Sequence, residues 1–158
     1  FAGNEVDVLL DKAIREEYPE VDVPLSMIRK FKESYSYVGE SESGARVKIP
    51  VGGKPRKIEI GKQVGESCNE LLQEIFESLK KVIAMASPQS VFSLLQNIIL
   101  TGGGSRIRNV DQELQRLLSD DGYEDPEVTI SSREVKPFVA IGAIKVAKAA
   151  RDDQWVRL

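Results

Sequence analysis

The stretch Asn97-Ile98-Ile99-Leu100-Thr101-Gly102-Gly103-Gly104 decides how this sequence is interpreted. Its first five residues form a short apolar run that is typical of a buried strand. The three glycines let the backbone turn sharply and let a ligand approach without a Cβ in the way. Asn109, a few residues further on, is suited to cap a helix. We therefore predict a strand, a glycine turn and a helix in succession.

The residues after this turn complete one βαβ unit. A helix follows Asn109, and Val128-Thr129-Ile130 forms the second strand. The helix N-terminus presents unpaired N–H groups that favour an anionic ligand, but the same turn could simply pack a helix on a strand. A Rossmann fingerprint would need glycine where Ile107 stands, and a P-loop would need Gly-Lys-Ser/Thr. Both of these classes are therefore disfavoured.

Helical and strand patterns alternate on both sides of this unit. Upstream, Asn4 is suited to cap the first helix, and Gly52-Gly53 signals the turn of a β-hairpin. Downstream, Pro137 opens a last helix. Before the turn, the periodicity predicts helices over residues 4–18, 22–35, 64–86 and 89–96. The β-hairpin between the second and third of these helices spans residues 46–60.

Composition narrows the functional classes. The 158 residues, 41% hydrophobic and 30% charged, suit one ordinary domain or half of a larger one. The formal net charge of −3 argues against a nucleic-acid partner, and no apolar run approaches the roughly 20 residues that insertion into a bilayer needs. There is no histidine, which excludes His-based catalytic triads and His-based metal sites. The single cysteine, Cys68, cannot form an internal disulfide and fits a reducing cytoplasm.

Several polar groups have competing interpretations. Lys32-Glu33 lies on the second helix, where spacing alone favours a solvated face over a nucleoside contact. Lys136 is likewise an ordinary lysine at a loop end by spacing alone. Asp120-Asp121-Gly122 lacks the remaining ligands of a calcium loop, and we find no metal-ligand spacing. Cys68 lies on an apolar helix stripe and is interpreted as a small buried hydrophobe.

Four motifs, in order along nearly the whole chain, resemble the actin, Hsp70 and sugar-kinase superfamily. Ile98–Gly104 looks like its adenosine motif, and Ala2–Asp7 resembles the turn at which bacterial actins leave the phosphate-binding strands. Lys32-Glu33, with Tyr37-Val38 behind it, resembles the actin helix that lies over adenine. Glu134–Ala143 resembles the segment whose lysine approaches the base. Within the bacterial actins, the similarity is greatest to the filament proteins that align magnetosomes.

The resemblance implies an α/β fold, with a mixture of α+β character. We expect the second-half domain of an actin-like ATPase, with a short mixed sheet flanked by helices and a small subdomain that contains the hairpin. Residues 1–22 and 87–158 would form the large subdomain, and residues 23–86 the small one. Because the chain begins at Phe1 and has no Asp/Gly phosphate loop, we expect the C-terminal portion of a longer protein.

The resemblance also implies a role for particular residues. Gly3 would lie against the ribose or phosphates, Lys32 and Glu33 would contact adenine and ribose, and Lys136 would flank the base. Backbone at the glycine turn would receive the nucleotide, and the residues after it would close the adenosine side: Gly102, Gly103, Gly104, Ser105, Arg106 and Ile107. No catalytic or metal-binding residue is assigned within this chain.

The implied cofactor is ATP or ADP with Mg²⁺, the metal being held mainly by the other half of the fold. The chain alone should therefore not hydrolyse ATP. The implied partners are further copies of the protein in a cytoplasmic, cytoskeletal filament, together with magnetosome-associated proteins. No nucleic acid and no membrane insertion are implied. Two alternatives stay open: a non-catalytic adaptor with the same fold, and a small-molecule kinase of the same superfamily.

Overall fold

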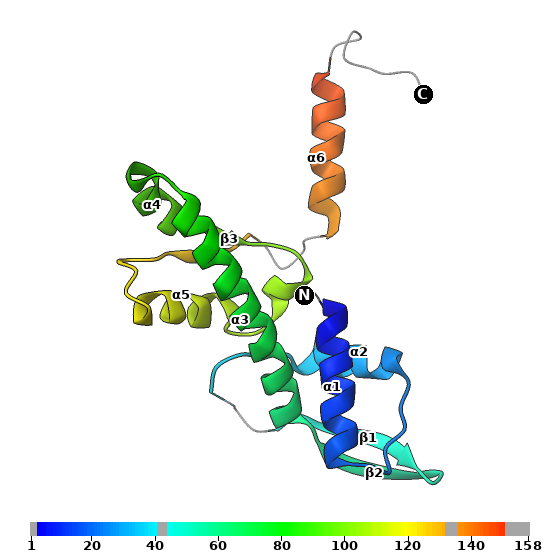
Figure 1. The fold of residues 1–158 in the computed structure, drawn as a ribbon. Helices are drawn as coiled ribbons and strands as arrows, with labels where there is room; N and C mark the ends of the chain where they lie inside the picture. The colour runs from blue at the N-terminus through cyan, green and yellow to red at the C-terminus, as the bar shows by residue number, and fades with distance from the viewer. Residues whose placement is uncertain (1–2, 41–43, 132–135, 151–158) are drawn as a thin grey trace.

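The computed structural model describes residues 3–40, 44–131 and 136–150, apart from the side chains of residues 136–139. Helices and two short sheets alternate along the chain (Figure 1). The elements are α1 (Gly3–Glu17), α2 (Leu25–Tyr35), β1 (Arg46–Val51), β2 (Lys54–Glu59), α3 (Gly61–Met85), α4 (Pro88–Leu95), β3 (Ile98–Leu100), η1 (Gly103–Arg106), α5 (Val110–Asp120), β4 (Val128–Ile130) and α6 (Lys136–Ala149).

The long helix α3 is the spine of the molecule. It runs diagonally through Figure 1, from the hairpin β1–β2 at one end to α4 at the other. Helices α1, α2 and α5 all pack against it. Its apolar stripe places Val64, Cys68 and Leu72 in the core. The 3.6-residue periodicity that predicted this helix is therefore confirmed, with a start three residues earlier, at Gly61.

Strands β1 and β2 form the predicted antiparallel hairpin. Gly52 and Gly53 have φ angles of 55° and 77°, which is the pair of positive values that a two-residue type I′ turn requires. Val47 lies opposite Ile58, and both side chains are buried against the core. The second strand begins at Lys54, earlier than the alternation indicated, because the tight turn allows pairing to start at once.

The predicted βαβ unit is also confirmed. Strand β3 pairs in parallel with β4, and α5 is the connection between them. The strand ends at Leu100, so Thr101 belongs to the turn rather than to the strand. Buried Val110, Leu114 and Leu118 form the inner face of α5.

Two predicted helix caps differ from the structure. Helix α1 begins at Gly3, so Asn4 lies inside the helix; its side-chain oxygen accepts a hydrogen bond from Arg29 instead of capping. Asn109 does precede α5, but it has a left-handed φ of 64° and its side chain makes no capping hydrogen bond. Asn tolerates this conformation better than most residues do, so its backbone, not its amide, begins the helix.

Helix α6 projects away from the other elements in Figure 1. Its Ile141 and Ile144 are about half exposed, and Val146 is largely exposed. Its first turn contains Pro137, as predicted. Among the helices that the structure describes, none is both long enough and apolar enough to cross a bilayer.

Candidate functional site

The glycine turn after β3 exposes its backbone. Gly102 has a φ of 87°, a backbone conformation that residues other than glycine rarely adopt. Apart from its chain neighbours, a Cβ added at Gly102 or Gly103 would meet no heavy atom of the described residues within 4 Å. These two residues therefore leave open space in front of the main chain, where a ligand could lie against the backbone.

The residues that follow Gly102 pack the inner side of the turn against the core. Gly103–Arg106 form the short 3₁₀ helix η1, and the buried Ser105 hydroxyl donates to the Gly102 carbonyl at 2.9 Å. Ile107 is buried, whereas the Arg106 side chain is exposed. Ser105 and Ile107 thus fix the shape of the turn, and Arg106 is the member of this run whose side chain is free to reach a ligand.

Lys32 is held in place rather than solvated. Its side chain is 17% exposed, and its ammonium lies 2.5 Å from Asp7 Oδ1. The same ammonium donates to the Gly3 carbonyl at 2.6 Å. The interpretation of Lys32 as part of a solvated helix face is therefore wrong. Lys32 and Gly3, two residues that the resemblance implied, are in direct contact.

Asp7 was missed as a functional candidate, although α1 carries a signal for it. Asp7, Leu10 and Ile14 share one helical face at i, i+3 and i+7, and all three are 0% exposed. A carboxylate on an apolar face must be paired, because burying a lone charge is very costly. Its other oxygen, Oδ2, accepts from Arg29 Nε at 3.0 Å.

Helix α3 lies beside both groups of predicted residues. Helix α2, which carries Lys32, packs against α3. Leu71 of α3 lies 4.0 Å from the position that a Cβ on Gly104 would take. The glycine turn and the helix of Lys32 therefore share α3 as a neighbour.

A backbone link joins the same two segments. Tyr37 and Arg108 form a parallel bridge, in which Val38 N donates to the Arg108 carbonyl and Arg108 N donates to the Ser36 carbonyl. The Arg108 guanidinium also donates to the carbonyls of Ser36 and Tyr35. The end of α2 is thus fastened to the chain directly after the glycine turn.

Burial makes Cys68 inert. Removal from water raises the pKa of its thiol to about 11, although the Tyr37 backbone N–H and the Lys32 charge both act in the opposite direction. A thiol with this pKa is overwhelmingly protonated at neutral pH and is a poor nucleophile. The interpretation of Cys68 as a small buried hydrophobe agrees with this environment.

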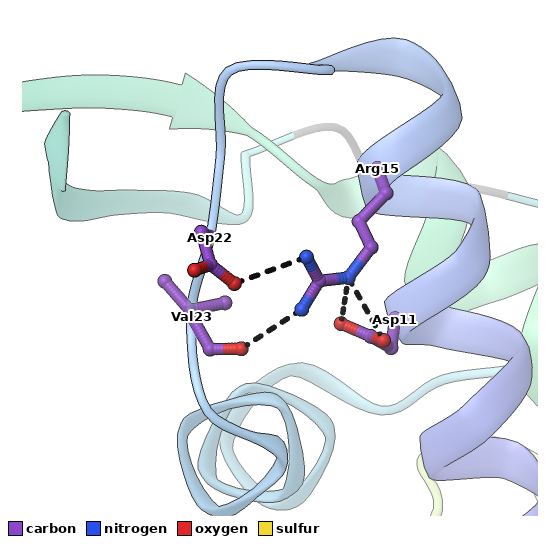
Figure 2. A network of polar contacts seen from close by, with 4 residues as sticks. All are labelled: Asp11, Arg15, Asp22 and Val23. Carbon is purple, nitrogen blue, oxygen red and sulfur yellow. Dashed lines mark hydrogen bonds and ion pairs between the residues drawn. The ribbon is translucent and has the colours of Figure 1, made fainter.

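A second polar network fixes the end of α1 (Figure 2). Arg15 lies between Asp11, one turn earlier on α1, and Asp22 in the segment that leads to α2. It also donates to the Val23 carbonyl at 3.2 Å. The two carboxylates raise the pKa of Arg15 above its ordinary value, chiefly through the hydrogen bond that Arg15 donates to Asp11. This Arg15 clamp ties the end of α1 to the segment before α2 and so helps to place α2, which carries Lys32.

The remaining predicted residues are less well placed. Glu33 is exposed, as a solvated helix face predicts. Lys136 is the first residue of α6; its side chain, and Glu134 and Val135 before it, lie outside the described residues.

A cavity of about 670 Å³ lies elsewhere, between α3 and α5. Its walls include Asn69, Glu113 and Arg116, and none of the predicted site residues lines it. Within residues 3–40, 44–131 and 136–150, no three acidic or cysteine side chains gather as metal ligands would.

The fold combines a parallel βαβ unit that has an open glycine turn with a β-hairpin and with helices that pack on α3. The family model of the MreB/Mbl protein matches residues 1–154, and the chain therefore belongs to this family of bacterial actins. The superfamily resemblance and the expected fold class are both confirmed.

Two curated relatives cover almost all of the chain. Actin-like protein MamK of Paramagnetospirillum magneticum is 34% identical over 99% of this chain and 44% of its own length. Actin-like protein MamK of Magnetospirillum gryphiswaldense is 32% identical over 99% of this chain and 43% of its own length. The chain thus spans somewhat less than half the length of these relatives.

Solved structures agree with these relatives. The chain is similar to a MamK double helical filament, with a TM-score of 0.87 and 31% identity over 95% of this chain and 45% of that one. It is also similar to a non-polymerising MamK A278D mutant bound to AMPPNP, with a TM-score of 0.84 and 30% identity over 94% and 45%. The similarity to MamK within the bacterial actins is therefore confirmed.

Proposed function

We propose that this chain is the nucleoside-binding portion of an actin-like protein that assembles into filaments in an ATP-dependent way. One observation carries the proposal: the backbone of Gly102 and Gly103 is open, and the chain directly after this turn is joined through Arg108 to the end of α2, the helix that carries the held ammonium of Lys32. An AMPPNP-bound MamK and a MamK filament are both similar to the chain over more than nine-tenths of its length, which supports the proposal.

The described residues fit the nucleoside side of such a ligand. A side chain at Gly102 or Gly103 would fill the space in front of the turn, so glycine leaves room for the sugar or base. Gly3 and Lys32 would border the ligand, and the exposed Glu33 and Arg106 would reach it by turning towards it. Bound Mg²⁺ would neutralise phosphate charge during hydrolysis, and we place its ligands mainly outside this chain.

In the cell, the proposed product is a cytoskeletal filament made of copies of the whole protein. By the resemblance to MamK, the filament would align magnetosomes in the cytoplasm, with magnetosome-associated proteins as further partners. Residues 23–86, which include the hairpin, would be the small subdomain that takes part in contacts along the filament. Residues 1–22 and 87–158 would be the large subdomain.

Nucleotide affinity tests the proposal. In the intact protein, Gly103→Val and Lys32→Ala should each weaken AMPPNP binding, because one fills the space at the turn and the other removes the held ammonium. Lys12→Ala is the matched control, since Lys12 is an exposed lysine on α1 that contacts only Glu16 in the described residues. Equal affinity in the wild type and both site variants would overturn the proposed contacts and favour the adaptor alternative.

Turnover gives a second test. The isolated chain should show no ATP hydrolysis, because we place the phosphate and metal ligands elsewhere in the whole protein. Hydrolysis by the isolated chain at the rate of the intact protein would contradict this division of the site.

A further inference from the structure

Asp7 is the one acidic side chain that is fully buried in the described part of the chain. It lies on α1, and both of its cationic partners come from α2. A buried carboxylate without a cationic partner is strongly destabilising, so these two partners stabilise the fold. Stability alone, however, does not require that one partner be Lys32, a predicted site residue.

The two carboxylate oxygens of Asp7 contact different cations. Oδ2 accepts from Arg29, whose side chain is about half exposed, and Oδ1 lies 2.5 Å from the Lys32 ammonium. Arg29 also reaches Asn4 on the exposed side of α1. Oδ1 is therefore dedicated to Lys32, and it sets the direction in which that side chain extends.

The Lys32 ammonium has three N–H donors and donates one of them to the Gly3 carbonyl. Its contact with Asp7 is an ion pair, because Oδ1 has no hydrogen-bond partner among the described residues. The remaining N–H groups and the aliphatic stem are left for a ligand. Such a stem covers the flat face of a base well, while the fixed head group keeps its charge beside the Gly3 backbone. A lysine freed from Asp7 would instead move among many rotamers, and ordering it would cost entropy upon binding.

We propose that Asp7 is a positioning residue for nucleoside binding, which holds Lys32 and the Gly3 end of α1 in the orientation that the nucleotide meets. This inference rests on the proposed function, since it concerns the same site. It assigns Asp7 no direct contact with the nucleotide. Asp7 acts only through Lys32, so its effect on binding should disappear when Lys32 is absent.

A double-mutant cycle in the intact protein tests this dependence. The variants are Asp7→Asn, Lys32→Met and the pair together, and the readout is AMPPNP affinity at constant salt. Asp7→Asn should weaken binding about tenfold in the wild-type background and less than twofold in the Lys32→Met background, because contacting residues are energetically coupled. An equal loss in both backgrounds would mean a purely structural role and would overturn the inference.

Arg29→Met is the matched control. It removes the other cation from the same carboxylate and leaves the contact between Asp7 and Lys32 intact. We expect a lower melting temperature with AMPPNP affinity within twofold of the wild type. A tenfold loss of affinity in Arg29→Met would show that any disturbance of the buried carboxylate weakens binding, which would also overturn the inference.

A labelling experiment covers the case in which Asp7→Asn fails to fold, because it uses the wild-type protein. An amine reagent should modify Lys32 far more slowly than Lys12 and Lys62, whose side chains are 72% and 80% exposed. Modification of Lys32 at the rate of those two lysines would show that Asp7 does not hold it.

The results separate the two proposals. If wild-type protein does not bind AMPPNP, the proposed function fails and the role of Asp7 fails with it. If wild-type protein binds and Asp7→Asn binds equally well, the proposed function stands and the positioning role alone is overturned.

Discussion

Two regions of the molecule differ in how they cover their apolar side chains. In the region built from α1, α2, the hairpin and the first half of α3, Leu10, Ile14 and Ile49 are almost completely buried. Around α4, β3 and α6, by contrast, Phe92 is 58% exposed and Ile99 is 62% exposed. The first region thus has a core of fully buried apolar side chains, although Val8 and Leu25 on its surface are exposed, and the second leaves more of its apolar surface uncovered.

The comparison locates the candidate site at the border between these regions. Lys32 and Asp7 belong to the packed region, where a buried ion pair fixes their geometry. Gly102 and Gly103 belong to the less covered region, where open space surrounds the backbone. The candidate site thus combines residues held by a buried ion pair with a turn whose backbone is open, which is an arrangement suited to receiving a ligand.

The largest effect expected is on stability, and it is tested by an Ile→Ala substitution made once in each region. Ile14→Ala should lower the free energy of unfolding by about 4 kcal/mol, because it leaves a cavity in a fully buried site. Ile144→Ala, at a side chain that is 53% exposed, should change it by less than about 0.5 kcal/mol. Urea denaturation measures both, and similar losses would show that the regions do not differ.

Glycine substitutions sharpen the same contrast. A Cβ on Gly65 would lie 2.3 Å from the Tyr37 hydroxyl, which donates to the Gly61 carbonyl. Gly65→Ala should therefore cost about 2.5 kcal/mol, through displacement of a buried ring and loss of its hydrogen bond. The new methyl group of Gly103→Ala would meet nothing within 4 Å in the part of the chain that the structure describes, so this variant should leave stability nearly unchanged. Equal melting temperatures for the two variants would contradict the packing around Tyr37.

The pH dependence of stability tests the burial of Cys68. Its folded-state pKa of about 11 exceeds the ordinary value of 9.0, so between these values the folded state holds a proton that the unfolded state has lost. Stability from this thiol is complete below pH 9 and is lost as the pH rises towards 11, by roughly 2 kcal/mol at pH 10.5. Cys68→Ala should show a shallower alkaline loss in urea denaturation, and parallel curves would refute the prediction.

The smallest effect expected comes from the clamp of Figure 2. Arg15→Met should lower the melting temperature slightly, because its contacts with Asp11 and Asp22 are exposed to solvent. The difference from the wild type should shrink in high salt, which screens exposed charges. A large loss that is insensitive to salt would mean that the aliphatic stem, not the charge, joins α1 to the segment before α2.

Local patterns in the sequence predict most of this fold. Helical periodicity finds α3, and the Gly52-Gly53 pair finds the hairpin, because each is determined by residues close in the chain. The parallel pairing of β3 with β4 follows from the strand–turn–helix–strand order. The caps were less predictable, because the amide of Asn4 has a stronger partner in Arg29, 25 residues away.

The candidate site was only partly predictable, for the same reason. The glycine turn is a local feature, so its open backbone could be predicted from three consecutive residues. The state of Lys32 depends on Asp7, 25 positions earlier, and spacing within α2 carries no information about that contact. The resemblance to actins indicated Lys32 as a site residue, whereas only the structure shows what holds it.

Hydrogen–deuterium exchange of the intact protein, with and without AMPPNP, tests the central claim most directly. If the nucleoside lies between the glycine turn and Lys32, amides in residues 102–106 and in the last turn of α2 should exchange more slowly with nucleotide. Exchange of the amides in the hairpin β1–β2 should not be slowed by direct contact with the nucleotide. Protection that leaves residues 102–106 unchanged while the nucleotide is bound would contradict the proposed site.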